Sequence, residues 1–90
     1  MELQDEKLSR AIGASSRRQI LHLLTDQELR VKEIAQRTSQ SVSLASRHLK
    51  LLYDLGFLTV RIDPPNKYYS LKIKEFKELL SSYDKVLKKI

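Results

Sequence analysis

One stretch of the sequence, residues 41–55, gathers side chains that bind anions and polar groups on one face of an expected helix. At about 100° per residue, one arc of this helix carries Ser43, Ser46, Arg47, Lys50 and Asp54, with Val42 and Tyr53 at its edge. The opposite arc comprises Leu44, Ala45, His48, Leu51, Leu52 and Leu55. Serine hydroxyls bond donors or acceptors, and a guanidinium forks onto two acceptors. The polar arc is therefore either an ordinary solvated face or a face for a wide, negatively charged partner.

The composition of the chain agrees with an acidic partner. The 90 residues include 17 Lys and Arg against 11 Asp and Glu, a formal net charge of +6. Such an excess favours a polyanion, although many small proteins that bind none are also basic. The length predicts a single domain, residues 1–90, whose modest core leaves an apolar stripe for a partner subunit to cover.

Several function classes are excluded by what the sequence lacks. Without cysteine there are no disulfides or thiolate metal sites, which favours a reducing cytoplasm. The first ten residues have no apolar core of a secretory signal, and no run approaches the roughly 18 apolar residues of a membrane span. No phosphate-cradling glycine loop, metal-ligand spacing or cysteine nucleophile is present, so we expect neither an enzyme nor a cofactor.

The residues before 41 predict three helices and a turn. A loose apolar stripe gives a first helix over 1–13, and "ASSRRQILHLLTD" gives a second, capped by Ser15 or Ser16. Residues 28–31 are at most a short extended stretch, and 31–38 form a short helix. The tight turn that follows places Ser41 as the N-cap of the polar-faced helix.

The residues after 55 predict a hairpin and a last helix. Gly56 ends the polar-faced helix, and residues 57–73 alternate at period two on either side of the turn "DPPN". From residue 74 to 90, apolar residues recur at intervals of three and four, as in an amphipathic helix. The order α-α-(short β)-α-α-β-β-α is a mostly α fold with a two-stranded β-wing (α+β), a winged helix-turn-helix.

In that fold the helix over 41–55 enters the major groove of double-stranded DNA. Arg47 would fork onto guanine or hold a phosphate, and Ser43 and Ser46 would bond either kind of group. Val42 would contact a thymine methyl group, and Lys50 a phosphate. The alternative is a winged-helix protein-interaction module of a transcription or replication complex, whose mark would be an exposed apolar patch on this face.

Four further basic residues are candidate DNA contacts. Arg61 and Lys67 flank the tip of the wing, where they would lie on the phosphate backbone or in a minor groove, although Asp63 opposes phosphate contact. Arg17 and Arg18 open the second helix, where either one clamps a phosphate or both are ordinary surface residues.

The segments "SRRQILHLL", "ELRVKEIA", "SVSLASRHLKLLYDLGFL" and "YYSLK" carry a resemblance over residues 14–72. There the chain resembles the ArsR-type winged-helix repressors, the arsenic- and metal-responsive transcription factors. The resemblance implies a homodimeric DNA-binding regulator, in particular a repressor, whose helices 1–13 and 74–90 form the subunit contact. The residues it assigns to that contact are Leu3, Leu8, Ile12, Phe76, Leu79, Leu80, Tyr83, Val86, Leu87 and Ile90.

The sequence departs from this family where its metal-sensing members bind metal. Those members place cysteines in the segment that here contains Arg30 and Lys32, and other members use histidine on the last helix, where this chain has none. His48 lies on the apolar arc and His22 stands alone, so we expect no metal site. Ser39 stands where the family often has glycine, which leaves the tilt of the polar-faced helix open.

Overall fold

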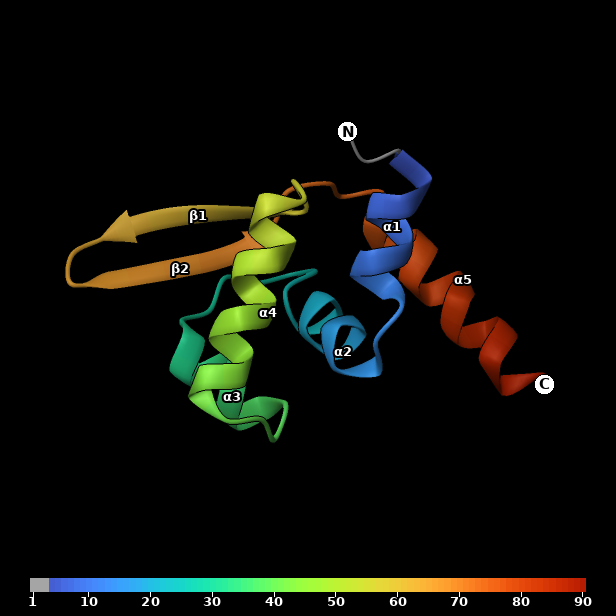
Figure 1. The fold of residues 1–90 in the computed structure, drawn as a ribbon, viewed down its shortest axis with the longest axis horizontal. Helices are drawn as coiled ribbons and strands as arrows, with labels where there is room; N and C mark the ends of the chain where they lie inside the picture. The colour runs from blue at the N-terminus through green and yellow to red at the C-terminus, as the bar shows by residue number, and fades with distance from the viewer. Residues whose placement is uncertain (1–3) are drawn as a thin grey trace.

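Within residues 4–90, which the computed structural model describes, the chain forms five helices and one two-stranded sheet (Figure 1). The elements are α1 (Gln4–Ile12), α2 (Ser15–Leu23), α3 (Val31–Arg37), α4 (Val42–Asp54), β1 (Leu58–Asp63), β2 (Asn66–Leu71) and α5 (Phe76–Lys88). This order confirms the predicted mostly α fold with a β-wing. The wing projects to one side of α4, while α1 and α5 lie on the other. Leu3, predicted as a dimer contact, lies outside the described residues.

One apolar core joins all of the helices to the base of the wing. It consists of Ala11, Ile20, Leu21, Leu24, Leu29, Ile34, Leu49, Leu52, Phe57, Leu58, Phe76 and Leu80. On α4 the buried stripe is Ala45, Leu49 and Leu52, at spacings of four and three. The predicted apolar arc omitted Leu49 and included Leu51 and Leu55, whereas these two are only half-buried. The helix is therefore rotated slightly from the predicted orientation, and its polar arc stays outside.

Both ends of α4 are fixed by local hydrogen bonds. The Ser41 hydroxyl accepts a bond from the Leu44 amide at 3.0 Å, which confirms the predicted N-cap. At the other end the Phe57 amide donates to the Leu52 carbonyl at 3.0 Å around Gly56, whose φ is +92°. A left-handed residue with this bond is the common C-terminal motif that favours glycine. The two caps set where α4 begins and ends.

Ser39 adopts the left-handed conformation at the turn between α3 and α4, with φ of 55°. Its neighbour closes the turn, because the Gln40 amide donates to the Ala35 carbonyl at 2.9 Å. The Gln40 side chain also donates to the Ser16 carbonyl of α2 at 3.3 Å. The turn thus keeps the geometry that a glycine would give, at a conformational cost that serine bears.

Ser39→Gly is expected to raise the free energy of unfolding by about 0.5–1 kcal/mol, since glycine adopts this φ without strain but loses more chain entropy on folding. Thermal unfolding followed by circular dichroism measures the change. Gly56→Ala is the matched comparison: it has open space for a Cβ but the same kind of φ, so it should lower the melting temperature. A lower melting temperature for Ser39→Gly would contradict this account of the turn.

The start of α2 differs from the prediction. Ala14, not Ser15 or Ser16, precedes the helix, and no side chain caps it. The Ala14 carbonyl accepts bonds from the Arg17 and Arg18 amides at 3.1 and 3.0 Å. The predicted serine cap is therefore wrong, because both serines already lie within the first helical turn.

The wing is a regular antiparallel hairpin, paired from Leu58↔Leu71 to Asp63↔Asn66 with Pro64 and Pro65 in the turn. A third segment, around Leu29, pairs with strand β2 of this hairpin. The Leu29 and Tyr69 amides donate to each other's carbonyls at 3.0 and 2.8 Å, which confirms the predicted extended stretch near residues 28–31. This pair ties the wing to the loop between α2 and α3.

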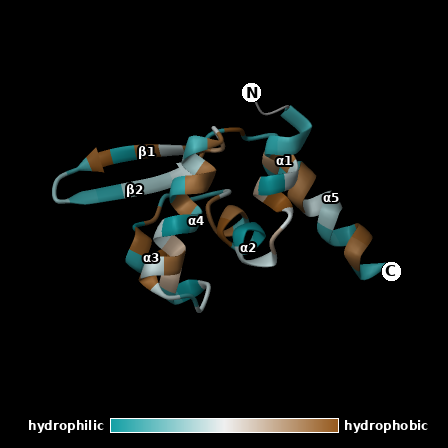
Figure 2. Cartoon of the chain, in the orientation of Figure 1, coloured by the Kyte–Doolittle hydropathy of each residue, from teal (hydrophilic) through white to brown (hydrophobic). Residues whose placement is uncertain are grey.

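The helices alternate hydrophilic and hydrophobic residues rather than forming continuous apolar rods (Figure 2). Accordingly, none of the helices in residues 4–90 combines the length and the hydropathy needed to cross a membrane.

Candidate nucleic-acid interface

The outer face of α4 carries the predicted DNA-binding residues in one exposed row. Val42 is 47% exposed, and Ser43, Ser46, Arg47 and Lys50 are exposed as well. These side chains stand outward because the opposite side of the helix is held in the core. We call this exposed row, Val42, Ser43, Ser46, Arg47 and Lys50, the outer face of α4.

The two cations of the outer face differ in what they contact. Lys50 Nζ lies 3.0 Å from Asp54 Oδ2, one helical turn away, and both side chains are exposed. A pair of this kind contributes little and opens readily. Arg47 forms no hydrogen bond or ion pair with any residue of the described chain. The guanidinium of Arg47 is therefore free to bond groups outside the protomer.

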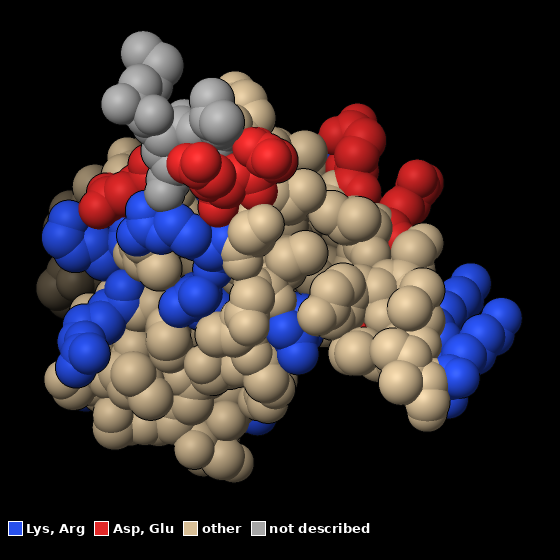
Figure 3. Space-filling model, turned by 45° about the vertical axis from the view of Figure 1, so that its right-hand side comes forward, with Lys and Arg blue, Asp and Glu red and all other residues tan. Residues whose placement is uncertain are grey.

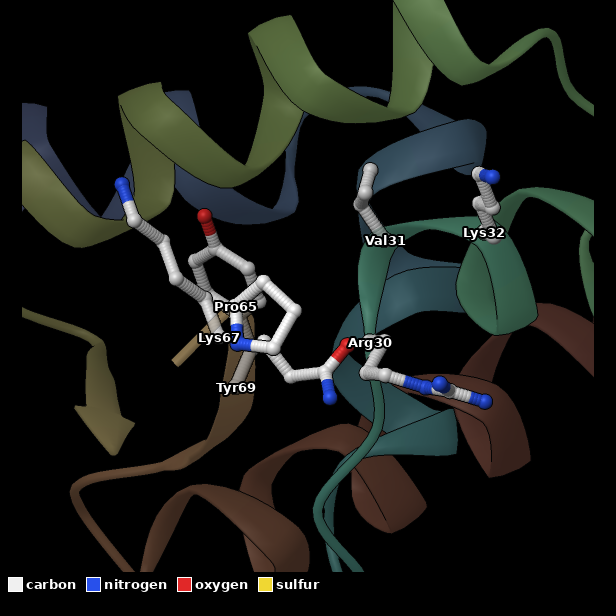
Figure 4. A pocket seen from close by; sticks show the side chains of 7 residues that line it. Arg30, Val31, Lys32, Pro65, Lys67 and Tyr69 are labelled. Atoms are coloured by element: carbon white, nitrogen blue, oxygen red, sulfur yellow. The ribbon is translucent and has the colours of Figure 1, made fainter. Parts of the chain in front are cut away.

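A groove of about 460 Å³ separates α4 from the wing. Its lining combines Ser46, Lys50 and Tyr53 of the helix with Val60, Ile62, Lys67 and Tyr69 of the wing. Lys67 also borders a second hollow of about 430 Å³ beside the start of α3. Figure 4 shows the Lys67 side chain extending toward α4, while Arg30 points away from it. Lys67 is thus placed beside the outer face, as a wing cation that contacts a neighbouring phosphate would be.

Arg61, the other predicted wing contact, is already engaged within the protomer. Its guanidinium donates to Glu28 at 2.6, 3.0 and 3.1 Å and lies 4.4 Å from the centre of the Tyr68 ring. These bonds hold the pKa of Glu28 below its ordinary value, so the pair is present at neutral pH and opens only as the pH falls through that lowered pKa. A direct phosphate contact by Arg61 would require this clamp to open.

We expect Glu28→Gln and Arg61→Gln to loosen the wing to a similar extent. Each removes the same clamp, so the Leu29 and Tyr69 amides should exchange with solvent about two- to fivefold faster, as for a weak surface pair. The double variant should add little, because the first change already breaks the contact. Hydrogen exchange followed by NMR measures this, with Lys67→Gln in the same wing as the control. Unchanged exchange in Glu28→Gln would contradict the clamp.

Arg17 and Arg18 face different surroundings although they are adjacent. The Arg18 guanidinium donates to the Ile12 carbonyl and lies 4.8 Å from the centre of the Tyr83 ring, which joins α1, α2 and α5. Arg17 is half-buried, and its Nε is shielded from solvent without a hydrogen-bond partner in the described chain. Arg18 therefore has a structural role, whereas the phosphate contact predicted for Arg17 would have to use the guanidinium nitrogens other than this shielded Nε.

The residues predicted to contact a partner subunit fall into three groups by their exposure. Phe76 and Leu80 are 4% and 1% exposed and fill the protomer's own core, so they support α5 from inside and are not direct subunit contacts. Val86 and Ile90 are 59% and 95% exposed, and Leu79 and Leu87 are exposed beside them. The third group, Leu8, Ile12 and Tyr83, is half-buried.

The exposed members form an uncharged surface along α5. Figure 3 shows a largely tan area on this side of the molecule, between basic side chains at the left and the basic end of α5 at the right. Lys85 and Lys88 lie in the last turn of that helix. An apolar stripe of this length is unusual at a solvated surface of so small a domain.

An ion pair lies in the segment where the metal-sensing members of the ArsR-type repressors place cysteines. Arg30 Nε lies 3.0 Å from Glu33 Oε1, and the Arg30 amide donates to the same oxygen at 3.1 Å. The hydrogen bonds hold the pKa of Glu33 below its ordinary value. Residues 4–90 contain no group of three or more His, Cys, Asp or Glu side chains arranged to hold a metal ion.

Comparison of the sequence with known proteins identifies a family and a relative. Residues 14–60 match the profile of the family described as bacterial regulatory protein, arsR family. The transcriptional activator HlyU of Vibrio cholerae is 34% identical over 73 residues, which are 81% of this chain and 68% of that protein.

Solved structures of similar proteins have the same fold as this chain. The structure of HlyU from Vibrio cholerae has 30% identity and a TM-score of 0.81, over 92% of this chain and 90% of that one. A homodimeric winged helix-turn-helix DNA-binding domain from Mycobacterium bovis, described as a possible ArsR-family regulator, has 27% identity and a TM-score of 0.81, over 94% and 79%. The chain therefore belongs to the arsR family of bacterial regulatory proteins and is a transcriptional regulator with a DNA-binding winged helix-turn-helix domain, not an enzyme.

Proposed function

We propose that the chain binds a specific double-stranded DNA site as a homodimer and represses the adjacent gene. The observation that carries this proposal is the outer face of α4, a row of hydroxyl and basic groups on a helix anchored by Ala45, Leu49 and Leu52. The major groove is about 12 Å wide and admits one helix, whose first turns meet the base edges.

Each residue of the outer face has a role that follows from its position. Ser43 and Ser46 lie in the first turns of α4 and bond base edges or phosphates, and Val42 contacts a thymine methyl group. Arg47 forks onto guanine O6 and N7, which its unpaired guanidinium permits. Lys50 and, across the groove, Lys67 bind phosphates of the strand that passes between α4 and the wing.

Dimerisation uses the exposed stripe of α5 together with α1. The support is the exposure of Leu79, Val86, Leu87 and Ile90 and the homodimeric structural neighbour. A two-fold dimer presents both α4 helices to half-sites about 34 Å apart, one turn of DNA. Each recognition helix then reads the same half-site sequence.

Repression is the proposed direction, because a dimer that covers promoter DNA excludes other proteins from it. The relative with 34% identity is named a transcriptional activator, so the direction needs its own test. A reporter gene placed behind the selected DNA site should lose expression when the protein is produced. A gain in expression would make the protein an activator and leave the DNA-binding proposal intact.

A protein-interaction module is the second candidate function. The observation that favours it is the exposure of Tyr53 and Ile62 at the rim of the α4–wing groove, 51% and 64%. Lys50 and Lys67 interrupt these apolar residues, however, so they form no continuous patch. A partner protein captured in high salt and after nuclease treatment would support this candidate.

Selection of bound sequences from a random DNA pool tests the proposed function. We expect enrichment of a two-fold symmetric site with half-sites one DNA turn apart. On that site the logarithm of the affinity should fall linearly with the logarithm of the salt concentration, by about 0.9 for each phosphate neutralised. No enrichment, together with no binding to any duplex at low salt, would overturn the proposal.

A further inference from the structure

Asp54 is the last residue of α4 and lines the groove between that helix and the wing. Its Oδ2 accepts a hydrogen bond of 3.0 Å from Lys50 Nζ. The inner side of α4 is fixed by the core and by a contact of 3.2 Å between His48 Nε2 and the Ser16 hydroxyl of α2. Asp54 is therefore held beside the path that the proposed function gives to a DNA strand.

The charges in this groove are of both signs. Among the described residues that line it, Asp54 is the one carboxylate, and Lys50 and Lys67 are the two cations. Lys67 forms no hydrogen bond or ion pair with any residue of the described chain, whereas Lys50 is engaged by Asp54. A groove that only had to attract phosphates would gain nothing from a carboxylate at this place.

The stability of α4 does not explain the position of Asp54. A carboxylate at the C-terminal end of a helix meets the negative end of the helix dipole. A lysine that precedes its acidic partner by four residues is also the less favourable order of such a pair. The side chains of Lys50 and Asp54 are 78% and 55% exposed, so water screens their attraction. The pair therefore matters chiefly when another anion approaches Lys50.

We propose that Asp54 competes with the DNA backbone for Lys50 and so limits how tightly the α4–wing groove holds a phosphate. This inference rests on the proposed function. A phosphate oxygen that bonds Lys50 Nζ replaces Asp54 Oδ2, and the released carboxylate stays in the groove one helical turn away. The free energy of the ion pair is therefore subtracted from that of the phosphate contact.

The consequence is a limit on binding strength that does not depend on sequence. A phosphate carries no information about its base, so the competition weakens binding to every duplex alike. Non-target sites greatly outnumber the target site, and binding to them consists almost entirely of phosphate contacts. Asp54 thus sets how strongly the protein holds DNA, whereas Ser43, Ser46 and Arg47 set which sequence it prefers.

Asp54→Asn tests the inference on the full chain, because it keeps the size of the side chain and removes its charge. We expect the affinity for the selected duplex to rise about two- to fivefold per protomer, as for the loss of an exposed ion pair, or about 4- to 25-fold for a dimer. An unrelated duplex of the same length should show the same gain. The salt slope should steepen by up to about 0.9 per protomer. Anisotropy measures all three quantities.

Two further variants separate competition for Lys50 from a general effect of charge. Glu75→Gln removes one negative charge from an exposed residue just before α5, outside the groove, and should leave the affinity almost unchanged. In a Lys50→Gln background the gain from Asp54→Asn should disappear, because no cation is left to release. Thermal melts confirm that the variants are folded, and Asp54→Asn should melt no lower than the wild type.

Three results would overturn the inference alone. The first is an affinity of Asp54→Asn that is equal to or below that of the wild type. The second is a gain that persists in the Lys50→Gln background, and the third is an equal gain in Glu75→Gln. Absence of duplex binding by the wild type would instead overturn the proposed function.

Discussion

Val86→Glu is expected to raise the dissociation constant of the homodimer at least a hundredfold. Val86 is 59% exposed in the protomer, so its replacement costs the fold little. In a two-fold interface the substitution occurs twice, and each carboxylate would be buried against apolar residues of α5 without a partner. A penalty of about 2.7 kcal/mol already corresponds to a factor of one hundred.

Sedimentation equilibrium measures this change, and anisotropy with the selected duplex measures its consequence. We expect the variant to be monomeric and to lose affinity for the two-fold symmetric site, while a single half-site is bound as before. Ser81→Glu is the matched control, because it adds the same charge to another exposed side of α5. A Val86→Glu protein that remains dimeric would show that the stripe on α5 is not the subunit contact.

Arg47→Ala is expected to weaken binding to the selected site by about 1–3 kcal/mol, or about 5- to 150-fold, and to relax specificity at one base pair. The reason is that a guanidinium forked onto guanine discriminates that base, whereas alanine cannot. The measurement is anisotropy with the selected duplex and with its single-base variants. Lys89→Ala, at the end of α5, removes the same charge away from the outer face and serves as the control.

Two outcomes would revise the role of Arg47. An equal loss on all sequences, with a reduced salt slope, would make it a phosphate contact. An unchanged affinity would remove it from the interface altogether.

The element order could be predicted because its signals are local. Ser41 and Gly56 mark the ends of α4 through bonds to residues three to five positions away, and period-two alternation defines the wing. The outer face of α4 follows from the same short-range periodicity. Each of these features depends on residue types within about one or two turns of chain.

The contacts that position the site could not be predicted in the same way. Arg61 and Glu28 are 33 residues apart, and Ser16 and His48 are 32 apart. Nothing in the local pattern distinguishes an arginine that faces solvent from one clamped by a distant carboxylate. The local pattern therefore predicts that Arg61 and Arg18 contact DNA, whereas both side chains have hydrogen-bond partners within the protomer.

The last helix shows a second limit of periodicity. Phe76, Leu80, Val86 and Ile90 belong to one apolar stripe, yet the first two fill the protomer core and the others are exposed. A repeat of three and four residues states that a face is apolar, but not whether its cover comes from the same chain or from another. Only the packing of α5 against α2 and the base of the wing distinguishes the residues covered by the same chain from those that stay exposed.

The central claim is that the outer face of α4 is the surface that binds DNA. Amide chemical shifts of the labelled protein, recorded as the selected duplex is added, test it most directly. The account predicts the largest changes at Ser43, Ser46 and Arg47, smaller ones at Lys67, and little change at Ser81 on α5. Large changes elsewhere, with the outer face of α4 unaffected at saturating DNA, would contradict it.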